Sequence, residues 1–353
     1  MTRIDHLKNL LSEYKCDAII VTHPIDLYYL TKQNISAGTL IVTTESAHLF
    51  VDGRYFEKCK ESLGFKVIEA RANNWTKELK ELPQIKSIGF DANTTSYSNY
   101  LDLKEKLNAK LIPVKGIGQN LRLIKDSEEI EKLKKAATLC REGYHHICNL
   151  LQEGVTEKEL STALEIFWKQ KADAKLAFEP IIAFGTNSSM PHYTPGNVPL
   201  KKGDTVLIDI GVELENYCSD MTRTLFFHSA NKEIRHIYSI VKQANEAAIQ
   251  LCTPGTLIKS LDEAARSLIE TAGFGKQFLH SLGHGLGLEV HELPFLSPTS
   301  TFGNQTLKPG MVITIEPGIY IPGVGGVRIE DTLVITASGH ENLTNLSKDI
   351  KIY

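Results

Sequence analysis

Apolar positions in the first third of the chain alternate between helical and strand-like spacing. Ile4, Leu7 and Leu11 recur on one helical face, and residues 17–22 and 39–43 are short apolar runs between polar segments. Recurrence at three- and four-residue intervals is typical of an amphipathic helix, whereas short apolar runs bounded by turn residues are typical of β-strands. The alternation predicts a small α/β domain.

Glycines and two helix-start signals mark the end of this domain. The pattern is interrupted by a pair of glycines, the first at Gly116. Asp126 and Thr156 each stand three residues before a Glu, which is the spacing of a capping box. We therefore expect an N-terminal domain over residues 1–120 and a larger domain over residues 121–353.

The larger domain changes character part-way along. Beyond about Leu176, short strands are separated by Gly and Pro turns, and helical periodicity returns over residues 231–251 and 261–271. Helices followed by a group of strands indicate a mixed architecture. The whole chain is predicted to be an α/β (α+β) protein.

Composition and charge narrow the class of function. Hydrophobic residues make up 42% and charged residues 23% of the 353 positions, as in a folded globular protein. The net charge of -3 lacks the basic excess that nucleic-acid binding needs. We find no signal peptide, no apolar run that would span a membrane, and six scattered cysteines without a disulfide or zinc-ribbon pattern. We expect a cytoplasmic protein with no nucleic-acid or membrane partner.

Acidic residues stand where apolar strands are predicted. Asp209 lies in a run that otherwise has the pattern of a buried strand, and Asp220 follows 11 residues later. Burying a lone carboxylate is costly in free energy, so each needs a partner. The spacing brings the two together across a hairpin whose turn lies near residues 213–217.

A second acidic hairpin is predicted near the C-terminal end. Glu316 ends one apolar run, Glu330 is embedded in the next, and a Gly-rich turn over residues 322–326 joins them. A single such acid is equally well explained by a strand edge or by a salt bridge, for example between Arg328 and Glu330. Four acids placed in this way point to a shared site.

Four converging carboxylates repel one another and need compensating positive charge. Two divalent metal ions balance four negative charges, and Arg223 and Arg328 are the alternative source within these segments. His284 stands between glycines that permit close approach of the backbone. An imidazole added to an oxygen-rich set suits Mn, Co, Fe or Zn.

The ordered set of motifs resembles the five metal ligands of the pita-bread metallopeptidases, in the branch of Xaa-Pro aminopeptidase and prolidase (Xaa-Pro dipeptidase). The matching positions are Asp209, Asp220, His284 in Gly-His-Gly, Glu316 in Glu-Pro-Gly and Glu330 in Arg-Ile-Glu-Asp. The likeness covers the whole chain, because residues 23–31 and 51–55 match as well. It implies a creatinase/prolidase-type N-terminal domain followed by a pita-bread catalytic domain.

The resemblance implies a role for each ligand. Asp209 would chelate one metal ion, and His284 with Glu316 would hold the other. Asp220 and Glu330 would bridge the pair. Two such ions activate a shared water molecule, as a bridging hydroxide, and polarise the scissile carbonyl. Glu316 would carry the proton from that water to the leaving nitrogen. Mn2+ is the first choice of metal, with Co2+, Fe2+ and Zn2+ as alternatives.

Three further histidines match positions around the family's substrate pocket, namely His192, His280 and His291. Imidazoles there can hydrogen-bond the substrate carbonyl and stabilise an oxyanion, and we expect His192 and His291 to be catalytic. Arg328 matches a family arginine near the metals and is expected to bind substrate. Pairing with a neighbouring acid explains Arg328 equally well.

One position departs from a dipeptidase pattern. Several prolidases carry His-Glu-x-Pro-Arg, whose arginine can pair with the free carboxylate of a dipeptide, and Phe295 stands at that position here. We therefore expect a metal-dependent aminopeptidase that hydrolyses the Xaa-Pro bond at the N-terminus of longer peptides, with Xaa-Pro dipeptidase as the alternative. An Xaa-Pro bond has no N–H, so peptidases that need that donor handle it poorly.

Other classes of function account for less of the sequence. A non-catalytic peptide-binding module would not need all five ligands, and a metal-independent hydrolase of the creatinase kind would lack some of them. A methionine aminopeptidase shares the ligands but would not need the N-terminal domain. The family commonly forms homodimers through that domain, so a homodimer is expected.

Overall fold

The computed structural model describes residues 2–70 and 85–353. By its internal contacts the chain divides into two compact units, Met1–Arg122 and Leu123–Tyr353. Each unit has a hydrophobic core of its own. Among the described residues, no helix combines the length and the apolar character that a membrane span requires.

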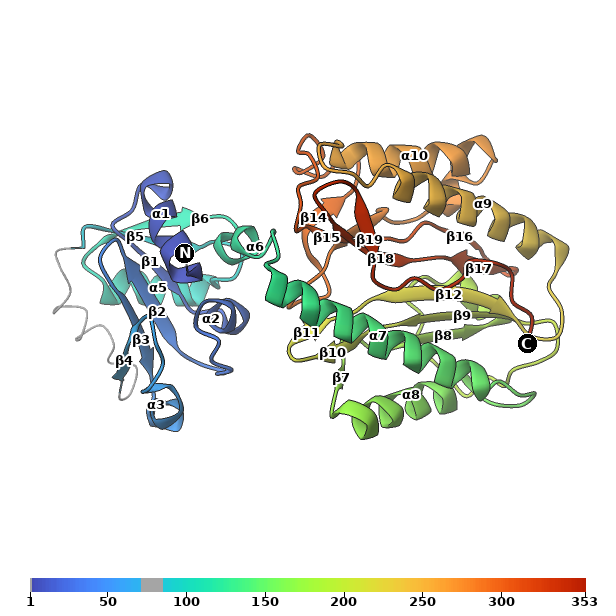
Figure 1. The fold of residues 1–353 in the computed structure, drawn as a ribbon, viewed down its shortest axis with the longest axis horizontal. Coiled ribbons are helices and arrows are strands. Elements are labelled where there is room, and N and C mark those ends of the chain that lie inside the picture. Colours follow the sequence, from blue (N-terminus) through green and yellow to red (C-terminus); the bar gives the residue numbers. More distant parts are fainter. Residues whose placement is uncertain (1, 71–84) are drawn as a thin grey trace. The chain divides into compact units, whose positions relative to one another are not determined.

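The first unit is built on a mixed six-stranded sheet (Figure 1). Its described elements are α1 (Arg3–Tyr14), β1 (Ala18–Val21), α2 (Pro24–Thr31), β2 (Thr39–Thr43), β3 (Ala47–Val51), α3 (Gly53–Cys59), β4 (Lys66–Glu69), β5 (Ser87–Asp91), α5 (Tyr97–Lys106), β6 (Lys110–Val114) and α6 (Ile117–Leu121). The sheet order is β4-β3-β2-β1-β5-β6, and β1 pairs antiparallel with β2 and parallel with β5. The predicted amphipathic helix is present as α1, which buries Ile4, Leu7 and Leu11.

The second unit begins with two helices and continues mainly as strands. Its elements are α7 (Ser127–Asn149), α8 (Glu157–Ala172), β7 (Lys175–Leu176), β8 (Ile181–Phe184), the 3-10 helix η2 (Gly185–Ser189), β9 (Thr205–Ile210), β10 (Val212–Leu214), β11 (Tyr217–Cys218), β12 (Met221–Phe226), α9 (Lys232–Gln250), α10 (Ile258–Thr271), the 3-10 helix η3 (Gly275–Gln277), β13 (Gly283–Gly285), β14 (Glu292–Leu296), β15 (Val312–Ile315), β16 (Gly318–Ile321), β17 (Gly325–Arg328), β18 (Asp331–Ile335) and β19 (His340–Asn342). The two predicted helical intervals after Leu176 are confirmed as α9 and α10.

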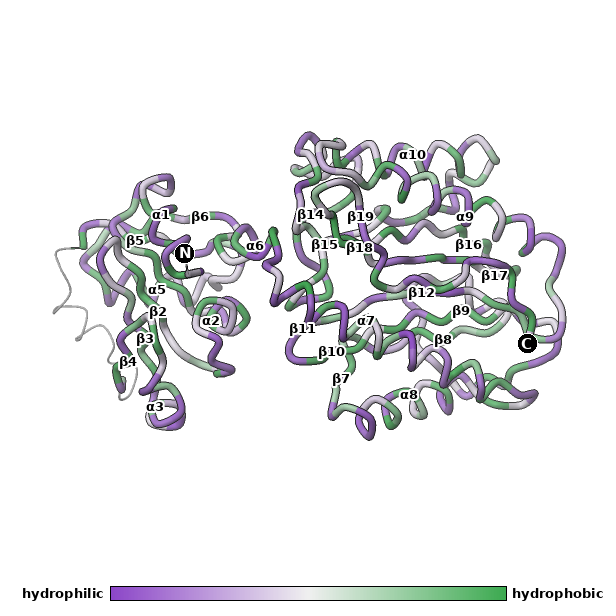
Figure 2. The backbone as a smooth tube through the Cα atoms, viewed as in Figure 1, coloured by the Kyte–Doolittle hydropathy of each residue, from purple (hydrophilic) through white to green (hydrophobic). Residues whose placement is uncertain are grey.

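Two pairs of helices enclose the strands of the second unit (Figure 1). The core on one side joins α9 and α10 to β15 through β18, and the core on the other joins α7 and α8 to β8, β9 and β12. Figure 2 shows apolar stretches along the central strands and alternating polar and apolar positions along these helices. This is the amphipathic pattern of helices that cover a sheet on one side and face water on the other.

Both predicted capping boxes are confirmed. Asp126 Oδ1 accepts a hydrogen bond from Glu129 N (2.9 Å) at the start of α7. Thr156 Oγ1 accepts one from Glu159 N (3.2 Å) at the start of α8. In each case the Glu side chain bonds back to the backbone of the capping residue, which satisfies otherwise unpaired amide groups.

The first acidic hairpin is confirmed. β9 pairs antiparallel with β12, and Asp209 lies opposite Thr222 in that ladder. The connection between them forms the short β10–β11 hairpin, whose turn residues Glu215 and Asn216 have positive φ. Asp220 therefore returns next to the strand that carries Asp209.

The second acidic hairpin is interrupted half-way. β15 pairs with β18, whereas β16 pairs with β17. Between the two pairings the first strand is broken at Glu316 and Pro317 and the second at Ile329 and Glu330. The prediction that Glu330 is embedded in a strand was therefore wrong. Pro317 has no N–H to contribute to a ladder, so the break frees both acids from regular pairing.

Candidate active site

Threonines attach the second acidic hairpin to the first. Thr222 Oγ1 on β12 donates to Glu330 Oε2 (2.7 Å). Thr332 Oγ1 on β18 donates to the Asp220 carbonyl oxygen (2.8 Å). All four residues are buried. The prediction that the two hairpins converge is confirmed.

The acids of both hairpins meet around His284. Its Nε2 lies 3.4 Å from Glu316 Oε1 and 3.6 Å from Asp220 Oδ2. Asp220, His284 and Glu330 each offer one ligand atom, and these atoms lie within 4.8 Å of one another. Three carboxylates and an imidazole are thus close enough to share cations.

The backbone beside His284 fixes the orientation of its ring. Nδ1 lies 3.0 Å from the Gly285 carbonyl oxygen, so Nδ1 carries the proton and Nε2 presents its lone pair to the carboxylates. Burial, reinforced by His291, lowers the pKa of His284 to about 4. A neutral imidazole whose other nitrogen donates to a carbonyl is the usual form of a metal-binding histidine.

The carboxyl groups of the cluster have raised pKa values. Burial, followed by the charge of Asp209, raises the pKa of Glu330 from 4.5 to about 8. Burial and the charge of Glu330 also raise the pKa values of Asp220 and Glu316 well above their usual range. Without added positive charge, this arrangement disfavours ionisation of all its members together.

The donor set fits divalent cations. Asp209 Oδ1 and Glu330 Oε1 are buried, and neither accepts a hydrogen bond from any residue that the structure describes. Buried carboxylate oxygens without partners are costly unless a cation or a donor satisfies them. Four carboxylates, one oriented imidazole and two unsatisfied oxygens match the oxygen-rich ligand set of two divalent metal ions.

Arg328 is the cation nearest to these acids. Its Nη2 donates to Asp209 Oδ2 (2.5 Å), its Nη1 to Tyr320 Oη (2.7 Å) and its Nε to Thr222 Oγ1 (3.2 Å). The alternative that Arg328 pairs with Glu330 was wrong, because the salt bridge is to Asp209. Glu330 is reached only indirectly, since the Thr222 hydroxyl that accepts from Arg328 donates to Glu330.

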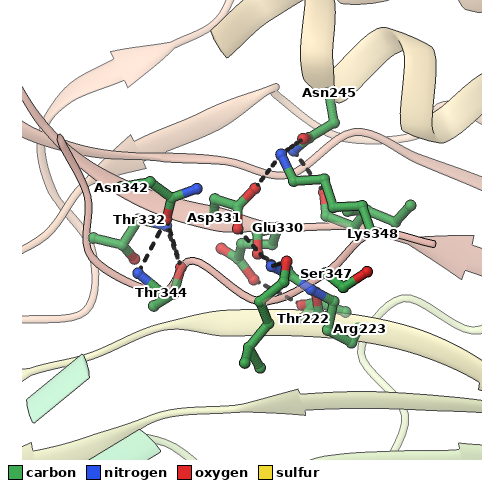
Figure 3. Close-up of polar contacts among 12 residues, drawn as sticks. Thr222, Arg223, Asn245, Glu330, Asp331, Thr332, Asn342, Thr344, Ser347 and Lys348 are labelled. Carbon is green, nitrogen blue, oxygen red and sulfur yellow. Dashed lines mark hydrogen bonds and ion pairs between the residues drawn. The ribbon is translucent and has the colours of Figure 1, made fainter. Parts of the chain in front are cut away.

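Arg223 belongs to a separate network on the other side of Glu330 (Figure 3). Its Nη2 donates to Asp331 Oδ1 (2.6 Å), and its Nη1 donates to the backbone carbonyl of Glu330. Lys348 Nζ lies 2.6 Å from Asp331 Oδ2. Arg223 therefore neutralises Asp331 and does not compensate the four acids of the cluster.

One cavity of about 430 Å3 brings the predicted site residues together. It is lined by His192, Asp209, Asp220, His280, His284, His291, Glu316, Arg328 and Glu330. His192 and His291 are exposed at this cavity, whereas His280 is half-buried. Both ring nitrogens of His280 are engaged, Nδ1 with the Ser281 carbonyl oxygen (2.8 Å) and Nε2 with Tyr320 Oη (2.9 Å).

Sequence reasoning missed several residues of the site. Thr222 and Tyr320 connect Arg328 to the acids and to His280. Phe178 and Glu179 also line the cavity. Thr222 and Thr224 lie two positions apart on either side of Arg223, so in a strand they share one face, which is a usable signal for polar groups directed to one side. Tyr320 carries no comparable signal.

Comparison with known proteins assigns the family. The model of metallopeptidase family M24 matches residues 131–337, and the model of the creatinase/prolidase N-terminal domain matches residues 3–124. The chain belongs to metallopeptidase family M24. The predicted family, with its creatinase-type N-terminal domain and pita-bread catalytic domain, is confirmed.

Relatives of this M24 peptidase match it along its full length. An Xaa-Pro dipeptidase of Pyrococcus furiosus is 37% identical over 350 residues and 99% of each chain. The structure of an Xaa-Pro dipeptidase from Bacillus anthracis has a TM-score of 0.95 at 35% identity, covering 99% of each chain. The structure of an X-Pro aminopeptidase from Thermotoga maritima has a TM-score of 0.89 at 31% identity, covering 99% of this chain and 100% of that one.

Proposed function

We propose that this metallopeptidase hydrolyses Xaa-Pro dipeptides with two divalent metal ions. The observation that carries the proposal is the buried cluster of carboxylates around His284, which opens into a cavity large enough for a dipeptide. Two of the full-length relatives described above are named Xaa-Pro dipeptidases. They favour the dipeptide over the longer substrate that Phe295 suggested in the sequence.

The proposal assigns each metal ligand a place. Asp209 would hold one ion, and His284 with Glu316 would hold the other. Asp220 and Glu330 would contribute ligand oxygens to both. When bound, two divalent ions lower the pKa of a water molecule and polarise the scissile carbonyl. The oxygen-rich set with a single imidazole supports Mn2+ as the native metal, with Co2+, Fe2+ and Zn2+ as alternatives.

Glu316 is the proposed proton carrier. The side chain of Glu316 is 17% exposed, whereas that of the neighbouring Asp220 is 6% exposed. Burial and the charge of Glu330 raise the pKa of Glu316. A carboxyl group that reaches the cavity and titrates above its usual range can accept a proton from the nucleophilic water and return it to the leaving nitrogen.

The exposed imidazoles are proposed to contact the substrate. His192 and His291 line the cavity beside the cluster, and burial, with the charge of His192, lowers the pKa of His291. A neutral imidazole donates one N–H, which can stabilise negative charge that develops on the scissile carbonyl oxygen. His280 and Arg328 complete the substrate side of the proposal, although their hydrogen bonds to Tyr320 and Asp209 also hold the site together.

The test compares two substrates on protein stripped with EDTA, with and without Mn2+. An Xaa-Pro dipeptide and an Xaa-Pro-Yaa tripeptide are supplied side by side. We expect metal-dependent cleavage of the dipeptide with a higher kcat/KM than for the tripeptide. Cleavage of neither substrate with any of the four metals contradicts the proposal and favours a peptide-binding module.

An Xaa-Pro aminopeptidase acting on longer peptides is the second candidate. The observation in its favour is Phe295, an apolar side chain that is 40% exposed and lines the cavity where a dipeptidase would place an arginine. The likeness to the Thermotoga maritima X-Pro aminopeptidase also supports it. A higher kcat/KM for the tripeptide would establish this alternative.

The proposal includes a homodimer located in the cytoplasm. The dimer rests on the family resemblance, and sedimentation velocity tests it directly. All six cysteines are free and buried, which supports a reducing compartment. The assignment of catalysis to residues 121–353, with residues 1–120 as an accessory domain, is supported by the location of the whole metal cluster in the second unit.

A further inference from the structure

One buried carboxylate outside the metal cluster belongs to Glu157. Glu157 is the first residue of α8, and its side chain is fully buried. Among the described residues, all hydrogen bonds to its carboxylate come from one segment of the chain. This segment begins at Phe184 and includes the His192 loop, defined here as residues 185–198. This loop carries His192 into the cavity.

Four donors converge on the Glu157 carboxylate. Oε1 accepts from Phe184 N (2.8 Å) and from Asn187 Nδ2 (2.9 Å). Oε2 accepts from Tyr193 Oη (2.7 Å) and from Gly196 N (3.0 Å). Two donors precede His192 in sequence and two follow it, so the carboxylate joins both ends of the loop.

These four bonds replace a counter-ion. Within residues 2–70 and 85–353, Glu157 forms no salt bridge with a lysine or arginine. The charge lies at the N-terminus of α8, where the helix dipole favours an anion. Hydrogen bonds to an ionised acceptor are stronger than those between neutral groups. Only a carboxylate of this length accepts all four donors, because an amide would turn its own N–H groups toward two of them.

The loop therefore depends on Glu157 for its conformation next to the site. Tyr193 is the immediate neighbour of His192, and burial together with the bond to Glu157 raises the pKa of Tyr193 to about 12. The phenol thus stays a donor. Ser188 Oγ accepts from Gly326 N (2.8 Å) and ties the start of the loop to β17. Hydrogen bonds to Glu157 and from Gly326 to Ser188 thus fix the segment that carries His192 at several points.

We propose that Glu157 is a positioning residue for His192, fixing the loop that presents this imidazole to the scissile carbonyl. The role of Glu157 in catalysis rests on the proposed function, whereas its role in holding the His192 loop does not. Kinetics test the first role, and hydrogen exchange tests the second. The hydrogen-bond partners of the Glu157 carboxylate in the described residues include none of the proposed metal ligands.

The first measurement is hydrogen exchange of the whole protein followed by mass spectrometry. Glu157→Gln should speed exchange in peptides covering residues 184–198 by about tenfold or more, because an NH2 group replaces one carboxylate oxygen and either the Phe184 or the Gly196 amide loses its acceptor. Peptides from α9 and α10 should not change. Glu159→Gln is the matched control. Glu159 lies in the same turn of α8, but within residues 2–70 and 85–353 its carboxylate bonds only to Thr156. Unchanged exchange over residues 184–198 in Glu157→Gln overturns the proposal.

The second measurement is a double-mutant cycle with His192→Ala. Glu157→Gln alone should lower kcat/KM for the cleaved Xaa-Pro substrate by about 10- to 100-fold, the cost of a misplaced catalytic group. In the His192→Ala background the same change should cost less than about twofold, because the group to be positioned is gone. Equal losses in both backgrounds would reveal a general structural role and overturn the proposal.

A milder variant covers the case in which Glu157→Gln does not fold. Asn187→Ala removes one of the four donors and leaves the carboxylate with the other three. It should raise exchange over residues 184–198 and lower kcat/KM a few-fold, again only when His192 is present. If Asn187→Ala lowers kcat/KM equally with His192 and with His192→Ala, the proposal is overturned as well. If the wild-type protein cleaves no Xaa-Pro substrate, the proposed function fails, while the exchange experiment still decides the loop contact.

Discussion

Glu330 and Asp331 are neighbours in sequence and are both buried, yet their carboxyl groups have opposite pKa shifts. Glu330 faces the acids of the cavity, and burial together with Asp209 raises its pKa to about 8. Asp331 faces Arg223 and Lys348 (Figure 3). Burial alone would raise its pKa, but the two cations outweigh burial and lower it.

The difference separates a balanced network from an incomplete one. Around Asp331, two cations and several carbonyl groups satisfy the buried charges within the chain itself. Around Glu330, four carboxylates share Arg328 as their adjacent cation among the described residues, and two oxygens have no donor. The buried charge of Asp331 is neutralised within the chain, whereas the four acids around Glu330 can still bind added cations.

Removal of an acid that is proposed to bridge the two metal ions should have the largest effect. Glu330→Gln should lower kcat/KM by at least about 100-fold, because even partners outside the ligand shell of a metal contribute 10- to 100-fold. The metal-free variant should be as stable to urea as the metal-free wild type or more so, since a repelling charge is gone. The measurements are kcat/KM with saturating Mn2+ and urea unfolding in EDTA. Activity within a few-fold of wild type would contradict a ligand role.

The corresponding acid-to-amide substitution at the next residue, Asp331, should lower stability instead of activity. Asp331→Asn should lower the free energy of unfolding by about 3 kcal/mol, because the buried Arg223 and the partly buried Lys348 lose their charged partner. Asp349→Asn is the control, since Asp349 pairs with Lys242 at the exposed surface, where water screens the charges and the pair adds little to stability. Urea denaturation measures both. Similar losses in the two variants would show that burial adds nothing at Asp331.

The metal-free protein should lose stability as the pH rises. Glu330 binds its proton more tightly in the folded state, where its pKa is about 8, than in the unfolded state, where it is near 4.5. Between these values the folded protein holds more protons, so each such group lowers the free energy of unfolding by about 1.4 kcal/mol per pH unit. Saturating Mn2+ should abolish or reverse this slope, because metal binding releases the protons. Urea midpoints from pH 5 to 8, with EDTA or Mn2+, measure it. A flat profile in EDTA would contradict the raised pKa.

A cation added at the cavity should have the smallest effect. Phe295→Arg should increase the ratio of kcat/KM for an Xaa-Pro dipeptide over an Xaa-Pro-Yaa tripeptide by up to about fivefold, since an exposed ion pair contributes at most about 1 kcal/mol. Phe295→Leu keeps the site apolar and should leave the ratio unchanged. An equal change in both variants would show that size, and not charge, controls substrate length.

The acids of the site were visible in the sequence because a carboxylate is conspicuous inside an apolar strand. Asp209 and Glu316 stand out for this reason, and the hairpin spacing predicts their neighbours. Pairing across the fold was not visible, since Arg328 bonds to Asp209 over a separation of 119 residues while Glu330 lies only two positions away. Proximity in sequence favoured the wrong partner.

The break in the second hairpin could not be predicted from the pattern of apolar residues either. Ile329 continues the apolar alternation past the end of β17, so the run has the pattern of one strand. The exchange of partners between β15–β18 and β16–β17 depends on tertiary pairing. Helix starts were predictable because the capping residues of α7 and α8 act locally, whereas strand breaks of this kind do not.

The same break shields the site from changes in chain length. Ile315 lies opposite Asp331 on one side of Glu316 and Glu330, and Gly318 lies opposite Arg328 on the other. The two acids are therefore bracketed by short ladders that fix their register independently of the turn beyond them. Gly323 lies in the turn beyond these ladders, with positive φ and open space where a Cβ would stand. We expect an insertion after it to change the periphery of the second unit and to leave both carboxylates in place.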